Sequence, residues 1–191
     1  SNDYLGLATH PEVIRAAIHA TEQYGTGSGA SRLVSGTLPP HTHLETSLAT
    51  FKGTEAALLF GAGYLANIGI IPNLIGQGGL ILADRLCHAS LIDGCRLSRA
   101  DLRVFRHRDC AHLESLLRRR SASRPTLIIT EGLFSMDGDL APLSDLASLA
   151  ERYEATLYVD DAHGTGIMGP TGRGTIEQFG LEQRIPFHMG T

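Results

Sequence analysis

Groups that could do chemistry follow several of the apolar runs in this sequence, at the points where buried strands are expected to end. The turn at residues 61–63 (Gly-Ala-Gly) comes after the first run, and free backbone N–H groups at a helix start can bind a phosphate there. His88 follows the second run, Ser135 follows a later one, and Asp160 and His163 follow the last. A phosphate cradle, an imidazole, a hydroxyl and a carboxylate would therefore converge on one edge of a sheet.

The elements that must position these groups alternate between strand and helix patterns. Short apolar runs without alternation predict strands buried on both faces, as in a mostly parallel sheet. Helical stretches between them predict an α/β domain of three layers, with the sheet between helices. Ligands in such sheets bind at the carboxyl ends of the strands. The expected strands are residues 56–60, 80–83, 103–105, 126–130 and 156–159, and the expected helices between them are residues 65–75, 89–97, 111–119 and 143–153.

The first forty residues predict an arm, a helix and a glycine-rich loop ahead of this domain. Residues 11–24 carry the apolar stripe of a helix, and residues 25–40 are rich in Gly and Ser. A loop of that length is often functional. A second helix is expected over residues 43–52. The predicted domains are accordingly residues 1–40 and a large domain over residues 41–191.

Composition and charge exclude some classes of partner. The chain has 191 residues, of which 42% are hydrophobic and 19% charged, which suits one domain with a sizeable core. The net charge of −4 gives no reason to expect nucleic acid or an anionic membrane as a partner. No apolar run approaches the roughly 20 residues that span a bilayer. Cys87, Cys95 and Cys110 show no C-x-x-C spacing, so a reduced, cytoplasmic setting is predicted.

A dinucleotide site is the sharpest competing interpretation. The turn at residues 61–66 fits the Rossmann fingerprint, and Asp84 lies about twenty residues further on, where a ribose-binding acid belongs. This interpretation explains neither Ser135 nor residues 160–163. A metal site on residues 160–163 is disfavoured, because adjacent residues of a strand point to opposite faces, and no metal is predicted.

Each group also has an ordinary structural interpretation. The glycines could form a simple strand–helix turn, His88 could cap a helix, and Ser135 could only shape a turn. Asp160 and His163 could be polar residues that finish a strand. The joint arrangement favours a functional site, because several strand ends each deliver one suitable group.

Six stretches carry a resemblance to a known family. They are residues 1–7 (SNDYLGL), 27–32 (GSGASR), 88–90 (HAS), 131–139 (EGLFSMDGD), 160–166 (DDAHGTG) and 188–191 (HMGT). With these stretches the sequence resembles, over essentially its whole length, the α-oxoamine synthases, which are pyridoxal 5′-phosphate (PLP) enzymes of fold type I. The 8-amino-7-oxononanoate synthase branch is the most similar. The resemblance implies the large PLP-binding domain of that fold, incomplete at both ends.

The resemblance implies roles for residues that would hold the cofactor's phosphate and the substrate. Gly63 and Tyr64 match a turn that binds the cofactor through its backbone, although the family often has Phe at the position of Tyr64. Thr191 matches a phosphate-binding threonine, and Asn2 matches a residue that lines the substrate site.

Other implied roles concern the cofactor ring. His88 matches the imidazole stacked on the PLP ring, and Asp160 matches the carboxylate paired with the pyridine nitrogen. His163 and Ser135 match groups near the phenolic oxygen. A carboxylate within hydrogen-bond reach raises the proton affinity of the ring nitrogen, which keeps the ring an electron sink. His88, Asp160 and His163 are the predicted catalytic residues.

The activity implied is that of an acyltransferase of biotin biosynthesis, acting as a homodimer. An amino acid, L-alanine, would condense with pimeloyl-CoA or pimeloyl-carrier protein and lose CO2 to give 8-amino-7-oxononanoate. A glycine-using sister such as 2-amino-3-ketobutyrate CoA ligase stays open as an alternative. So does an inactive truncated remnant, because Lys52 is the only lysine and the family's Schiff-base lysine would lie just beyond Thr191. The chain alone is expected to be inactive.

Overall fold

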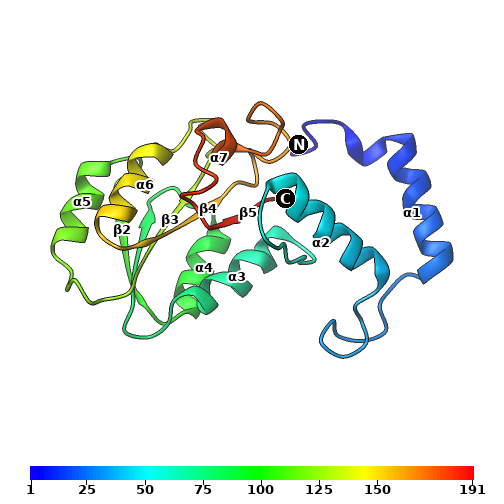
Figure 1. Ribbon diagram of the computed structural model, residues 1–191, viewed down its shortest axis with the longest axis horizontal. Helices are drawn as coiled ribbons and strands as arrows, with labels where there is room; N and C mark the ends of the chain where they lie inside the picture. The colour runs from blue at the N-terminus through cyan, green and yellow to red at the C-terminus, as the bar shows by residue number, and fades with distance from the viewer. The chain divides into compact units, whose positions relative to one another are not determined.

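The computed structural model describes all residues from 1 to 191 as two compact units, Ser1–Leu59 and Phe60–Thr191 (Figure 1). The predicted domain boundary at residue 40 stays a prediction about the whole protein. None of the helices has both the length and the apolar character that a bilayer span requires.

The first unit contains two α-helices and a long loop. After a short 3-10 helix, η1 (Leu7–Thr9), come α1 (Pro11–Tyr24) and α2 (Pro39–Lys52). The helix α2 begins four residues earlier than predicted, because two prolines occupy its first turn, where a missing N–H costs little. It ends at Gly53, whose φ of 69° is left-handed, a common helix ending.

The second unit is built on a five-stranded sheet in which every neighbouring pair of strands is parallel, as predicted. The strand order is β2-β1-β3-β4-β5. Continuous apolar runs form the central strands because both of their faces are covered. The strands are β1 (Leu80–Asp84), β2 (Asp101–Phe105), β3 (Thr126–Glu131), β4 (Thr156–Asp160) and β5 (Phe187–Met189).

Helices cover both faces of this sheet, which confirms the predicted three layers (Figure 1). On one face, Leu113 of α5 (Cys110–Arg118) and Leu146 of α6 (Leu143–Arg152) pack in the same cluster as Leu82. On the other face, Ile71 of α3 (Gly63–Leu74) and Leu91 of α4 (Ala89–Leu97) pack in the same cluster as Ile81 of β1. A last short helix is α7 (Thr175–Gln178).

The predicted strand at residues 56–60 is wrong. The backbone N–H of Leu59 donates to Oε1 of Glu45 at 2.8 Å, and its carbonyl accepts from Nη1 of Arg32 at 3.3 Å. These side chains take the groups that a neighbouring strand would need, and Leu58 is 67% exposed. The fifth strand of the sheet is β5, which the sequence patterns did not predict.

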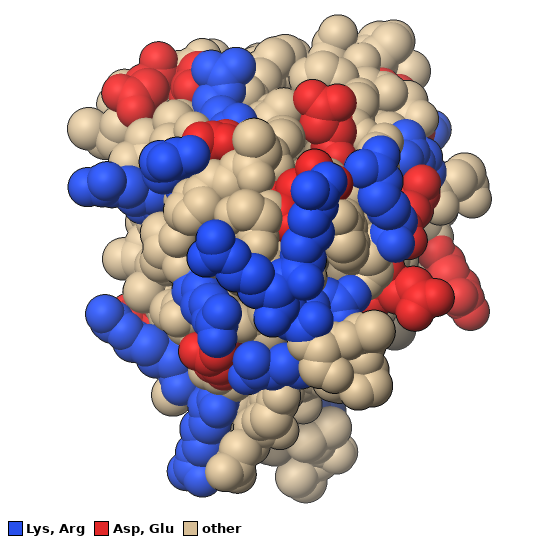
Figure 2. Space-filling model, turned by 90° about the vertical axis from the view of Figure 1, so that its left-hand side faces the viewer, with Lys and Arg blue, Asp and Glu red and all other residues tan.

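The arginines are unevenly distributed. Residues 96–124 hold nine arginines against three acidic residues, whereas the rest of the chain holds seven basic and seventeen acidic residues. Figure 2 shows Lys and Arg side chains gathered on one face of the protein. Several of these arginines pair with local carboxylates, as Arg106 does with Asp109 and Arg118 with Glu114. Exposed pairs of this kind contribute little to stability, so they neutralise charge more than they stabilise the fold.

Candidate active site

Three acidic residues end three adjacent strands at the carboxyl edge of the sheet. Asp84 ends β1, Glu131 ends β3 and Asp160 ends β4, and the register of the sheet sets Glu131 beside Asp160. All three are buried. Burial of several carboxyl groups together is unfavourable unless each finds a partner, so their partners identify what each one does.

Asp160 is 5% exposed and is bonded only by neutral donors. Nδ2 of Asn67 donates to its Oδ2 at 2.8 Å, and the backbone N–H of Ala162 donates to its Oδ1 at 3.1 Å. Burial raises the pKa of Asp160, although these hydrogen bonds and the nearby His88 and His163 oppose the rise. A cation placed against this carboxylate would compensate the charge that the protein leaves buried.

Asn67 connects Asp160 to His88 through Ser90. The amide Nδ2 of Asn67 also donates to Oγ of Ser90 at 2.9 Å, and Oγ of Ser90 lies 2.8 Å from Nδ1 of His88. The amide oxygen of Asn67 accepts from the hydroxyl of Tyr158 at 2.8 Å. Asn67, Ser90 and Tyr158 are buried, so this network has one arrangement fixed by the core.

His88 caps α4, so its ordinary interpretation is also correct. The backbone N–H of Ser90 donates to Nδ1 of His88 at 3.2 Å. Because Nδ1 accepts this bond, a neutral ring carries its proton on Nε2. The side chain of His88 is exposed and its ring is accessible from outside the sheet. The cap therefore fixes Nδ1 of His88 and leaves Nε2 available to a ligand.

Glu131 joins His88 to the segment that carries Ser135. Its Oε1 accepts from the backbone N–H of His88 at 2.6 Å, and the backbone of Ser135 also bonds to this carboxyl group. Burial raises the pKa of Glu131 to about 7, with a further rise from the charges of Asp160 and Asp84. Glu131 is therefore a buried acid that titrates near neutral pH.

Gly63 and Thr191 lie together at the start of α3. Ala62 precedes that helix without a side-chain cap, so the backbone N–H groups of its first turn are open to an anion. A Cβ atom added to Gly63 would lie 3.0 Å from Cγ2 of Thr191 and 3.6 Å from Cε of Met189. The fold thus brings the two predicted phosphate-binding positions side by side, and a side chain at residue 63 would push against Thr191.

The remaining predicted site residues are exposed or half-buried. Tyr64 is exposed and its hydroxyl donates to Oδ2 of Asp93 at 2.6 Å, a bond that raises the pKa of Tyr64. Ser135 is exposed on the segment between β3 and α6. His163 is half-buried and its charge acts on Asp160. Asn2 is an exposed residue of the first unit.

Sequence patterns missed four buried residues of this site. Asn67, Ser90 and Tyr158 form the network around Asp160, and Glu131 was given no role although it stands in a quoted motif. One signal was present: Asn67 is the one side chain with an amide in the otherwise apolar stretch from Leu65 to Ile71.

Asp84 does not suit the ribose-binding role of the dinucleotide interpretation. Its carboxylate accepts from the backbone N–H groups of Leu86 and Arg108, each at 2.9 Å, and from Nδ1 of His107 at 2.9 Å. These donors occupy most of its acceptor sites, and Asp84 is 1% exposed, so the carboxylate is not presented to a ribose hydroxyl. The strand that a Rossmann fingerprint needs before the glycines is absent as well.

Comparison with known proteins defines the family. A family model described as aminotransferase class I and II matches residues 1–191, and the chain belongs to this family. This membership overturns the dinucleotide interpretation.

Curated relatives are more specific. The chain is 58% identical over 191 residues to 8-amino-7-oxononanoate synthases from Geobacter sulfurreducens and from Citrifermentans bemidjiense. Each match covers 100% of this chain and 49% of the relative. The chain therefore spans about half the length of the curated relatives it matches.

Solved structures agree. A variant of serine palmitoyltransferase from S. paucimobilis with a bound PLP–myriocin aldimine superposes with a TM-score of 0.97 at 40% identity, and the match covers 100% of this chain and 50% of that one. An 8-amino-7-oxononanoate synthase from Francisella tularensis superposes with a TM-score of 0.80 at 32% identity, covering 95% and 49%. The resemblance to the α-oxoamine synthases and to their fold is confirmed.

Proposed function

We propose that the whole protein that contains this chain is a PLP-dependent acyltransferase that condenses L-alanine with a pimeloyl thioester to give 8-amino-7-oxononanoate. The observation that supports this most is the buried carboxylate of Asp160, which has only neutral donors as bonded partners. The identity of 58% to synthases of that name supports the particular reaction.

The cofactor fits the residues at the carboxyl edge. Backbone N–H groups at Gly63 and Tyr64, together with the hydroxyl of Thr191, would hold its phosphate. His88 would stack on the ring, and Ser135 and His163 would lie near the phenolic oxygen. These three roles are inferred from the family. When bound, PLP supplies an electron sink for the charge that develops at the α-carbon of the amino acid.

Asp160 would hold a proton on the pyridine nitrogen. A carboxylate in hydrogen-bond contact with that nitrogen favours its protonated form, because opposite charges stabilise each other strongly in a buried site. The same contact would stabilise the carboxylate, whose pKa burial now raises. Asn67 keeps Oδ2 of Asp160 in place, so the direction of the contact is set by the core.

His88 would orient the ring and donate one hydrogen bond to the substrate. Its Nδ1 is fixed by the N–H of Ser90, so Nε2 is the nitrogen that carries a proton toward the ligand. Its backbone is held by Glu131. An N–H in this position can stabilise negative charge on a carboxylate or enolate oxygen of the substrate.

We also propose that the whole protein is a homodimer, with Asn2 contributing to the substrate site. No side chain of α1 is buried, and Ile14 and Ile18 of that helix are exposed, as are Leu33 and Val34 of the following loop. Several exposed apolar side chains on one helix and the loop after it suit a surface that another chain covers. Light scattering that finds an active monomer at micromolar concentration would refute the dimer.

The test of function uses the purified full-length protein. Alanine, glycine and serine would each be offered with pimeloyl-CoA, pimeloyl-carrier protein, acetyl-CoA and palmitoyl-CoA, and release of the thiol would be followed. Fastest turnover with alanine and a pimeloyl thioester is expected. Faster turnover of glycine with acetyl-CoA, or of serine with palmitoyl-CoA, would assign the protein to a sister activity. Tight NAD binding without a PLP absorbance band would contradict the proposal altogether.

A further inference from the structure

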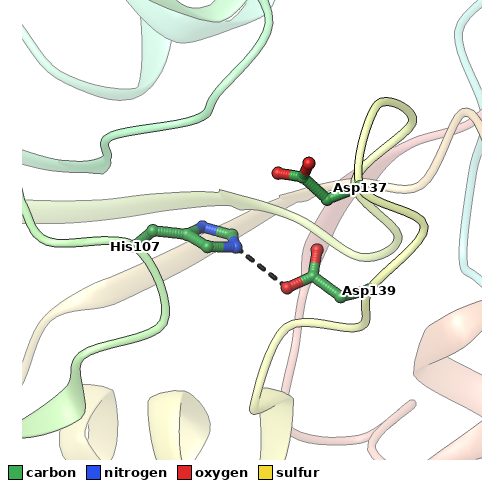
Figure 3. A group of neighbouring side chains, drawn as sticks. All are labelled: His107, Asp137 and Asp139. Atoms are coloured by element: carbon green, nitrogen blue, oxygen red, sulfur yellow. Dashed lines mark hydrogen bonds and ion pairs between the residues drawn. The ribbon is translucent and has the colours of Figure 1, made fainter.

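His107 lies between two carboxylates that come from different parts of the second unit. Its Nδ1 is 2.9 Å from Oδ1 of Asp84, at the end of β1. Its Nε2 is 3.0 Å from Oδ2 of Asp139, in the segment after β3, and Figure 3 shows this second contact. Neighbouring Arg108 repeats the pattern, with its backbone N–H on Asp84 and its Nη1 on Asp139, each at 2.9 Å. We call Asp84, His107 and Asp139 the His107 bridge.

The bridge requires a protonated imidazole. Both partners are carboxylates, which accept hydrogen bonds, so both ring nitrogens must donate. Burial lowers the pKa of His107, but hydrogen bonds to Asp84 and Asp139 outweigh burial and leave that pKa raised. Positively charged Arg108 and the exposed carboxylate of Asp137 are the other charged groups that face the ring.

The segment that the bridge holds is the one that carries Ser135. The ring of His107 meets Phe134 edge to face, with centroids 4.5 Å apart. The backbone N–H of Phe134 donates to the carbonyl of Asp139 at 2.9 Å, and that of Gly138 donates to the carbonyl of Phe134 at 2.8 Å. Ser135 thus lies in the sequence between Phe134 and Asp139, the two residues of this segment that His107 contacts directly. The side chain of Ser135 is exposed.

We propose that His107 is a positioning residue, which as an imidazolium fixes the segment from Phe134 to Asp139 and thereby places Ser135 for the cofactor. The inference rests on the proposed function for what Ser135 does, but the fixing of the segment stands on its own contacts. Loss of the charge on His107 would leave two carboxylates facing an uncharged ring, and Oδ1 of Asp139 is already buried without a hydrogen-bond partner. The segment would then be held less tightly.

A divalent cation is the competing explanation for this cluster. One ligand atom from each of His107, Asp137 and Asp139 lies within 4.8 Å of the others. A metal ligand must present a free lone pair, however, and both nitrogens of this ring point at carboxylates as donors. The two explanations differ in Asp137: a cation would need it, whereas the bridge makes no hydrogen bond to it.

The direction of the pH dependence follows from the raised pKa of His107. A group whose pKa is higher in the folded state stabilises that state fully below its unfolded value of about 6.5. The stabilisation disappears as pH rises through the folded pKa. The segment should therefore be most firmly held in mildly acidic solution and loosen in mildly alkaline solution.

The experiment is hydrogen exchange of the peptide over residues 131–141 in the full-length protein without cofactor, with exchange rates corrected for pH. The variants are Asp139→Asn, which removes one charge of the bridge, and His107→Phe, which keeps a ring against Phe134. Asp137→Asn is the matched control in the same segment. At pH 6 we expect roughly tenfold loss of protection in the first two, typical for a lost charge-assisted hydrogen bond, and none in the control.

The pH series and cofactor titration complete the test. Wild-type protection should fall as pH rises, and the fall should be clearly shallower in His107→Phe, where Glu131 is left as the group that titrates in this range. PLP should bind several-fold more weakly to Asp139→Asn. Unchanged protection in Asp139→Asn would overturn the inference, even if His107→Phe fails to fold. Equal losses in Asp137→Asn and Asp139→Asn would overturn it in favour of a cation. Failure of the wild type to bind PLP would overturn the proposed function, while the exchange data still decide whether the bridge fixes the segment.

Discussion

The ends of β1 and β4 each carry a buried aspartate, yet the surroundings of the two differ. Asp84 is met by the ring of His107 and by two backbone N–H groups, so its charge has a partner within the protein. Asp160 has an amide and one backbone N–H as bonded partners. One region is electrostatically complete, whereas the other leaves a carboxylate suited to a cationic ligand.

This difference separates a structural carboxylate from a functional one. A buried charge is tolerated when it is paired and hydrogen-bonded, and buried charges that are less completely paired are concentrated at functional sites. The contrast makes Asp160 the residue where PLP chemistry would depend on charge, and Asp84 the residue where stability would. Substitutions at the two positions should therefore affect different measurements.

The largest effect is expected from Asp160→Asn in the full-length enzyme. A neutral amide cannot hold the proton on the pyridine nitrogen, so exchange of the α-hydrogen of alanine with solvent should slow on the order of a hundredfold to a thousandfold. The measurement is NMR of alanine in deuterated buffer with saturating PLP. Equal exchange rates in variant and wild type would show that this carboxylate does not serve the ring.

Asp84→Asn should have the converse effect. Removing the charge of buried Asp84 takes away one of the two carboxylate partners of His107, and the free energy of unfolding should fall by about 3 kcal/mol. Urea denaturation of the full-length protein measures this. With saturating PLP, the rate of α-hydrogen exchange in the fraction that stays folded should fall far less than in Asp160→Asn. A variant as stable as wild type would mean that the pair at β1 contributes nothing.

Glu131, between the two aspartates, should make stability depend on pH. Its pKa of about 7 in the folded protein exceeds the usual value for Glu, so its contribution is present in acid and is lost as pH rises through 7. Without cofactor, the free energy of unfolding should fall by about 2 kcal/mol between pH 5 and pH 8, and Glu131→Gln should abolish most of that fall. Parallel pH profiles for both proteins would refute this assignment.

The smallest effect is expected from Tyr64→Phe. The bond from the hydroxyl of Tyr64 to Asp93 is exposed. Because the turn would bind PLP through backbone groups, we expect little change in either stability or PLP affinity. Fluorescence titration with PLP measures the second. A tenfold loss of affinity would mean that the hydroxyl itself binds the cofactor.

Sequence patterns predicted the sheet well, because strands buried on both faces leave continuous apolar runs. The patterns gave a wrong strand at residues 56–60 and missed the strand β5. Residues 56–60 have the right composition, but side chains of Arg32 and Glu45 take their backbone groups. The strand β5 has three residues, too few to give a periodic signal.

The candidate site was predictable only in part. Polar residues that follow strands are visible in a sequence, and the fold does bring Gly63 and Thr191 together. Which aspartate meets a cation is not visible, because His107 lies 23 residues beyond Asp84. Asn67 is 93 residues from the carboxylate it bonds. Long-range pairing of this kind is a property of the packed structure.

The most direct test is the protonation state of the PLP ring nitrogen, measured by nitrogen NMR of the full-length protein loaded with ¹⁵N-labelled PLP. We expect a protonated nitrogen in the wild type and in Asp84→Asn at neutral pH, and an unprotonated one in Asp160→Asn. An unprotonated nitrogen in the wild type, or the same signal in all three proteins, would contradict the assignment of Asp160.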